Sequence, residues 1–207
     1  MSTINPVTTP PPFINRPRET LLVRAEATIQ ALPEQVFAVI TDTASYPQWN
    51  SFVRSVAFVQ GSSIDQAGAV FDLSVDQPFT LLLDGAPVRN QFVAVVEGET
   101  STGYDPYPLR SMSRLEKRLV YEFVSLVGPD GQEIPFGNAE QLGNPQRHQV
   151  VQDLGDGKTR YFTFEDYTGI SPLLAPVTPL FRTELGLKAF AEDLKCEVER
   201  RINAGTL

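Results

Sequence analysis

Apolar and polar residues alternate along short stretches of the chain, which is the pattern of β-strands that bury one face. In residues 21–29, Val23, Ala25, Ala27 and Ile29 lie on one face, and charged or polar residues lie on the other. Similar apolar runs, separated by Gly, Pro, Asp and Asn, predict six more strands at residues 53–59, 69–75, 91–97, 115–126, 149–154 and 160–167. Strands that follow one another without intervening helices indicate an antiparallel meander.

Two short helical segments are predicted between the first and second strands. Pro33 fits the first helical position, where its missing N–H is not needed, and Val36, Phe37 and Ile40 form a short apolar stripe. This helix of about two turns is expected to end near Asp42. A second helical or turn segment covers the sequence SYPQWNSF.

Helical periodicity returns at the end of the chain, over residues 178–202. Apolar residues recur there at spacings of three, four and seven, so they form one stripe, while charged residues point elsewhere. The stripe consists of Leu180, Leu187, Phe190, Ala191, Leu194, Val198 and Ile202. One long amphipathic helix and a run of antiparallel strands predict the α+β fold class.

Composition and charge exclude several classes of function. Seventeen Lys and Arg against twenty-five Asp and Glu give a formal net charge of -8, without a basic cluster, so nucleic acid is not expected as a partner. Because the chain has one cysteine, Cys196, and one histidine, His148, neither a disulfide framework nor a multi-histidine metal site is possible. No metal and no cofactor are expected.

Residues 1–18 contain five prolines and no patterned apolar face, so we expect an extended or disordered lead-in before a single domain at residues 19–207. No apolar run reaches the roughly 18 residues of a membrane span, and the pattern of a signal peptide is missing. No stable membrane insertion and a cytoplasmic location are therefore expected.

Two stretches carry a family resemblance. The first, IQALPEQVFAVITDTASYPQWNSFV, leads from a strand through a proline to a helix ending in Asp and then to a Tyr-Pro-x-Trp-Asn segment. The second, GDGKTRYFTFEDYTG, places a Glu and an aromatic residue before a glycine that precedes the final helix. The residues concerned are Pro33, Val36, Phe37, Asp42, Tyr46, Pro47, Trp49 and Asn50, followed by Glu165, Tyr167 and Gly169.

With the order of the elements, these stretches resemble the SRPBCC superfamily, which includes START domains, birch-allergen-like proteins, polyketide cyclases and coenzyme Q-binding proteins. The resemblance covers residues 21–204 and implies a helix-grip fold, in which a curved antiparallel sheet wraps around the C-terminal helix and encloses a hydrophobic small molecule. Small inward residues such as Ala25, Ala69 and Ala191 would leave apolar space for it. The oxygenase members need histidine and aspartate iron ligands that a chain with one histidine cannot supply.

Glu165 is the strongest candidate for acid–base chemistry. Thr163, Glu165 and Tyr167 share one face of the last strand by their spacing, and the resemblance implies that this face looks inward. A carboxylate in a dry pocket suits a general acid or base near neutral pH, because desolvation raises a carboxyl pKa. If Phe162 and Phe164 face inward instead, Glu165 is an ordinary solvated carboxylate.

The partner of Glu165 depends on the hairpin before it. Asp156-Gly157 is a favoured two-residue turn, and counting back from it pairs His148 with Glu165, whereas a one-residue bulge substitutes Arg147. A His–Glu pair would be a proton-transfer unit, with both residues catalytic. An Arg–Glu pair would more often hold the structure or orient a substrate.

Substrate contacts are expected from residues on the predicted inner surface, with core packing as the alternative for the aromatic ones. They are Trp49, Tyr46, Tyr121, Thr163, Tyr167, Arg147, Phe190 and Leu194.

Two hypotheses of function remain open. The first is a cofactor-free cyclase or isomerase of secondary metabolism, acting on a polyketide-like hydrophobic metabolite whose shape the cavity imposes while a few polar groups move protons. The second is a lipid or quinone binding or transfer protein without chemistry. A buried acid with a partner favours the enzyme, and a wholly apolar cavity favours the carrier.

Overall fold

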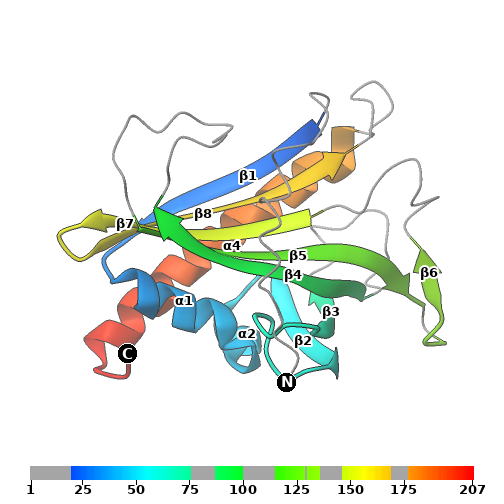
Figure 1. Ribbon diagram of the computed structural model, residues 1–207, viewed down its shortest axis with the longest axis horizontal. Coiled ribbons are helices and arrows are strands. Elements are labelled where there is room, and N and C mark those ends of the chain that lie inside the picture. The colour runs from blue at the N-terminus through cyan, green and yellow to red at the C-terminus, as the bar shows by residue number, and fades with distance from the viewer. Residues whose placement is uncertain (1–19, 76–86, 100–114, 129, 136–145, 169–176) are drawn as a thin grey trace, which may run out of the picture.

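The computed structural model describes residues 20–75, 87–99, 115–128, 130–135, 146–168 and 177–207 (Figure 1). Its elements in chain order are β1 (Thr20–Ile29), α1 (Pro33–Thr41), the 3₁₀ turn η2 (Thr43–Ser45), α2 (Tyr46–Trp49), β2 (Val53–Gln60), β3 (Val70–Val75), β4 (Val88–Glu99), β5 (Leu115–Val127), β6 (Glu133–Pro135), β7 (Gln146–Gly155), β8 (Lys158–Thr168) and α4 (Val177–Asn203). In these ranges, no helix combines the length and the apolar character needed to cross a membrane. The expected lead-in, residues 1–18, lies outside the described residues.

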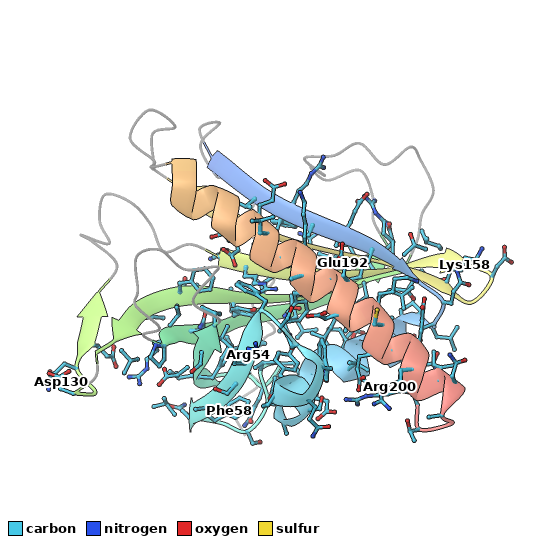
Figure 2. The ribbon with its side chains drawn as sticks, turned by 180° about the vertical axis from the view of Figure 1, so that it is seen from behind. Arg54, Phe58, Asp130, Lys158, Glu192 and Arg200 are labelled. Atoms are coloured by element: carbon cyan, nitrogen blue, oxygen red, sulfur yellow. The ribbon has the colours of Figure 1, made fainter. Side chains whose placement is uncertain are left out.

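The described strands form one antiparallel sheet in the order β1-β8-β7-β5-β4-β3-β2, and β6 pairs with β5 beside this path. Figure 2 shows α4 lying diagonally across one face of the sheet, where it packs mainly against β1, with α1 and α2 beside its C-terminal half. We call the face that α4 covers the inner face. This is the α+β helix-grip fold, so the predicted fold class is confirmed.

The core forms between the inner face and α4. Val23, Ala25 and Ile29 of β1 are buried there, as their alternation predicts. The apolar stripe of α4 faces them, and its residues Leu187, Phe190, Leu194 and Val198 are at most 1% exposed. The periodicity at the end of the chain therefore predicted the buried side of α4 correctly.

The strand boundaries differ from the predicted ones where the sequence is polar. β7 begins at Gln146 rather than at residue 149, because its first residues, Gln-Arg-His-Gln, show no apolar alternation although all four are buried. The short strand β6 lies between two of the predicted strands and was not predicted, because its three residues give no periodic signal.

Charged side chains fasten the C-terminal half of α4 to the short helices. Arg201 donates hydrogen bonds to the Asp42 carboxylate (2.8 Å) and to the Ser45 hydroxyl (2.8 Å), and its Nε donates to Glu197 (2.7 Å). About two turns earlier in α4, Asp193 accepts hydrogen bonds from the backbone N–H and the hydroxyl of Ser51, at 2.7 and 2.6 Å. These contacts fix where α4 lies on the inner face.

Candidate functional site

The register of the β7–β8 hairpin decides which side chains meet on the inner face. Asp156 and Gly157 at the turn have φ values of 54° and 68°, as a two-residue turn of this kind requires. A bulge then lies between Asp153 and Gly155, where the Asp153 carboxylate accepts a hydrogen bond of 2.7 Å from the Gly155 N–H. Beyond the bulge, Arg147 pairs with Glu165.

Of the two pairings open from the sequence, the structure has the bulged one with Arg147, and the pairing of His148 with Glu165 is wrong. His148 pairs with Phe164 and stacks on its ring, with centroids 4.5 Å apart and planes at 9°. Neighbouring residues of a strand point to opposite faces, so the bulge turns His148 away from the face that carries Glu165. His148 is buried, but on the outer face, and it has no place in a catalytic dyad with Glu165.

One row of directly paired residues crosses the inner face from β1 to β5. Val23 pairs with Glu165, Glu165 with Arg147, and Arg147 with Tyr121. All four side chains are buried, with Arg147 only 1% and Glu165 only 3% exposed. Of the two orientations open from the sequence, the structure has Glu165 inside, whereas Phe164 faces outward beside His148.

Arg147 lies at the centre of this row. Its guanidinium carbon is 4.8 Å from the ring centroid of Phe190 on α4 and 5.5 Å from that of Phe52, so aromatic rings flank it. Its Nε donates to the hydroxyl of Thr163 at 3.4 Å, and that hydroxyl donates to the His148 carbonyl at 2.9 Å. Its Nη2 is buried and has no hydrogen-bond acceptor among the described residues.

Phenol groups surround the guanidinium. Burial raises the pKa of Tyr121 to about 12; the charge of Arg147 acts in the opposite direction and that of Glu165 in the same direction. The pKa of Tyr161 is also raised, mainly by burial, and its hydroxyl donates to the Gln149 side chain at 3.0 Å. Both phenols are therefore protonated at neutral pH and can act as hydrogen-bonding groups but not as bases.

The Arg147 side chain remains a cation in this setting. Burial alone would lower its pKa, but the electrostatic interactions with Tyr121 and Glu165 act in the opposite direction, and the net shift is upward. The row therefore holds a fixed positive charge in a place that water does not reach.

The aromatic residues predicted from the Tyr-Pro-x-Trp-Asn segment pack beside this row. Tyr46 and Trp49 both meet Phe190 edge-to-face, at centroid distances of 5.8 and 5.9 Å. Each has its polar atom engaged, since the Tyr46 hydroxyl donates to the Ile40 carbonyl at 2.5 Å and the Trp49 Nε1 donates to the Ser45 hydroxyl at 2.9 Å. Both side chains pack in the core, and a ligand would contact only the surfaces of their rings.

Of the remaining predicted contacts, Thr163, Phe190 and Leu194 are buried on the inner side. Tyr167 occupies a β8 position opposite Leu21, and its side chain lies outside the described residues.

Sequence reasoning did not single out Phe52 and Gln149. Gln149 lies two residues from Arg147 on the same strand, so the period of two could have found it. Phe52 owes its place to Gly186 of α4, where a Cβ would come within 2.6 Å of the Phe52 ring. That contact joins distant parts of the chain and leaves no local signal.

Comparisons with known proteins agree with this architecture. Residues 20–122 match the model of a family described as polyketide cyclase / dehydrase and lipid transport. The fold is similar to that of the Zhui aromatase/cyclase from Streptomyces sp. R1128, with 15% identity and a TM-score of 0.56 over 90% of this chain and 98% of that chain. Norcoclaurine synthase from Thalictrum flavum gives 11% identity and a TM-score of 0.56 over 88% of this chain and 96% of that chain.

The major latex-like protein 151 from Panax ginseng has the same fold, with 12% identity and a TM-score of 0.53 over 86% of this chain and 97% of that chain. No curated protein matches the chain in sequence. At these identities the likeness to solved structures concerns the fold alone. The family match over residues 20–122 and the helix-grip fold agree with the resemblance to the SRPBCC superfamily that the sequence carries.

Proposed function

We propose that this protein binds one hydrophobic small molecule against its inner face and acts on it as a cofactor-free cyclase or isomerase of polyketide-like metabolites. The observation that carries the proposal is the buried row of Glu165, Arg147 and Tyr121. Removing two charged groups from water costs several kcal/mol for each. Such groups gather at functional sites, where their charge acts on a ligand.

The comparisons support the direction of the chemistry. The matching family model names polyketide cyclases, and the Zhui protein with the same fold is an aromatase/cyclase. A purely apolar inner face would have favoured a carrier, and the inner face described above is not purely apolar.

A cyclisation on this face needs a proton carrier and a group that stabilises an oxyanion. Glu165 would remove a proton from the carbon between two ketones, and the Arg147 guanidinium would stabilise the enolate oxygen. The enolate carbon then bonds to a second carbonyl carbon of the same molecule, and the oxygen of that carbonyl takes the proton back from Glu165. The product is a cyclic isomer of the substrate, so the reaction consumes no cofactor.

The test uses a synthetic poly-β-ketone thioester. Its cyclisation, followed by spontaneous loss of water to give the aromatic ring, is measured by absorbance against the same reaction in buffer. We expect acceleration by the protein, and a decrease of roughly 10²-fold or more in Glu165→Gln, which keeps the shape and removes the titratable proton. Glu26→Gln is the matched control, because Glu26 pairs with Arg160 on the outer face. No acceleration over buffer, or equal rates for Glu165→Gln and the unmodified protein, would refute the enzyme.

The second candidate is a lipid or quinone binding or transfer protein. The apolar part of the same face, with Phe52, Phe190 and Leu194 buried, favours it, and the family description includes lipid transport. A carrier would bind N-phenyl-1-naphthylamine and pass lipid to acceptor vesicles equally well with Glu165 or Gln at position 165. Mass spectrometry of molecules released on denaturing the purified protein would identify its ligand.

A further inference from the structure

We infer that the ligand of this protein carries an anionic oxygen, such as a carboxylate, enolate or phenolate, and that Nη2 of Arg147 receives it. The inference rests on the proposed binding of a hydrophobic molecule at the inner face and adds the chemical group by which that molecule is recognised. Its basis is the contrast between the burial of Arg147 and the bonding of its guanidinium.

The bonds of Arg147 within the chain leave part of its donor capacity unused. A guanidinium has five N–H donors in a fixed plane and no acceptor. The Nε bond to Thr163 is long, at 3.4 Å, and no described residue offers an acceptor to Nη2 although the side chain is 1% exposed. Buried charged donors without a partner are strongly unfavourable, so a retained one indicates an acceptor that arrives from outside the chain.

The neighbouring groups leave Nη2 without an acceptor. The Thr163 hydroxyl accepts from Nε rather than from Nη2, and the Tyr161 hydroxyl is engaged with the Gln149 side chain. Glu165 lies opposite Arg147 in the register and contributes a negative charge nearby, yet Nη2 has no acceptor among the described residues. We therefore assign the group that completes this arginine to the ligand.

An anion fits better than a neutral oxygen. A hydrogen bond between two charged groups is shorter and about twice as strong as one between neutral groups. A surrounding without water increases the difference, because the field of the guanidinium is little screened there. The rings of Phe52 and Phe190 flank Arg147 and would hold the hydrocarbon part of the same molecule beside its charged end.

The test compares two fluorescent probes that differ in one group. N-phenyl-1-naphthylamine is neutral, and 8-anilino-1-naphthalenesulfonate is the same ring system with a sulfonate. An apolar site without a cation prefers the neutral probe, since the sulfonate would lose its hydration. We expect the sulfonate to bind at least about 10-fold more tightly than the neutral probe. Energy transfer from Trp49, the one tryptophan of the chain, reports binding next to Phe190.

Arg147→Gln should weaken the binding of the sulfonate probe by roughly 10-fold or more and change the affinity for the neutral probe by less than about 3-fold. Arg160→Gln is the matched control, because Arg160 pairs with Glu26 on the outer face and should leave both affinities unchanged. Dodecanoate and dodecanol give a measurement on the unmodified protein, in case Arg147→Gln does not fold. Dodecanoate should displace the neutral probe at the lower concentration, although the alcohol is the more hydrophobic of the two.

The outcomes separate this inference from the proposed function. If both probes bind beside Trp49 but the neutral probe and dodecanol bind more tightly, the inference is overturned and the proposed binding of a hydrophobic molecule stands. If neither probe transfers energy from Trp49, the proposed function fails as well. A preference for the sulfonate and for dodecanoate that Arg147→Gln removes supports the inference.

Discussion

Replacing Gly186 by alanine should destabilise the protein, although the same change in an ordinary helix is stabilising. Gly186 lies inside α4, where alanine is favoured over glycine by about 1 kcal/mol. Here the added Cβ would come within 2.6 Å of Cδ2 and 2.8 Å of Cζ of Phe52, closer than such carbons approach in proteins. The ring is 5% exposed and packs next to Arg147, so it cannot yield without disturbing the buried row.

The size of the effect follows from two opposing contributions. Overpacking a dense core by one methyl group costs about 1 to 3 kcal/mol. Set against a helix-propensity gain of about 1 kcal/mol, this leaves an expected net destabilisation of about 1 kcal/mol. Urea unfolding, followed by the fluorescence of Trp49 and by far-UV circular dichroism, measures it as a lower midpoint at unchanged slope.

A double-mutant cycle isolates the cause. Phe52→Ala alone should destabilise by about 3 to 5 kcal/mol, because it removes a buried ring. With the ring removed, adding Gly186→Ala should stabilise by about 1 kcal/mol, as helix propensity requires. The reasoning is refuted if Gly186→Ala stabilises the protein that retains Phe52, or if the change has the same effect with and without the ring.

Three further changes have defined outcomes. Burial raises the pKa of Tyr121 above the value of about 10 for an unfolded chain, so the stabilising contribution of this phenol is complete below pH 10 and is lost as the pH rises toward 12. Tyr121→Phe should therefore flatten the decrease of unfolding free energy measured between pH 9 and 11. An unchanged slope would contradict this. Arg201→Ala should lower the unfolding free energy by about 2 kcal/mol through the loss of its charged hydrogen bonds to Asp42 and Glu197. Arg200→Ala should cause a smaller loss, because Arg200, labelled near the end of α4 in Figure 2, is more exposed. Equal losses would mean that Arg201 does not hold α4 against the short helices. Phe190→Ala should destabilise by about 3 to 5 kcal/mol in the same urea assay, and a loss below about 1 kcal/mol would mean that its ring is not part of a packed core.

The local patterns of the chain predicted most of the fold. Alternation of apolar and polar residues located β1, and helical periodicity located α4. Each element buries one face, so apolar residues recur along its sequence with the period of a strand or of a helix. The start of β7 was missed because its Gln-Arg-His-Gln segment is polar and buried at once, a combination that a pattern of hydrophobicity cannot detect.

The site was less predictable than the fold because it depends on register and on contacts between distant elements. The spacing of β8 placed Glu165 among the inward candidates, but the residue opposite it depended on one bulge, which a side-chain hydrogen bond from Asp153 accompanies. The position of the Phe52 ring beside Arg147 depends on Gly186 of α4, which lies far from Phe52 in the sequence.

The bulge in the β7–β8 hairpin decides which side chains of β7 face the interior of the protein. Leu154 is the residue without a partner in that bulge, and deleting it would leave Arg147 opposite Glu165, because the pairs on both sides of the bulge stay the same. One residue inserted between His148 and the bulge would instead shift the phase of β7 by one position against β8. The inward and outward side chains beyond the insertion would then change places, so that an imidazole would replace the guanidinium at the centre of the inner face. In this hairpin a single insertion would therefore act as a change of chemistry, which gives descendants of the chain a short mutational route to a different reaction on the same frame.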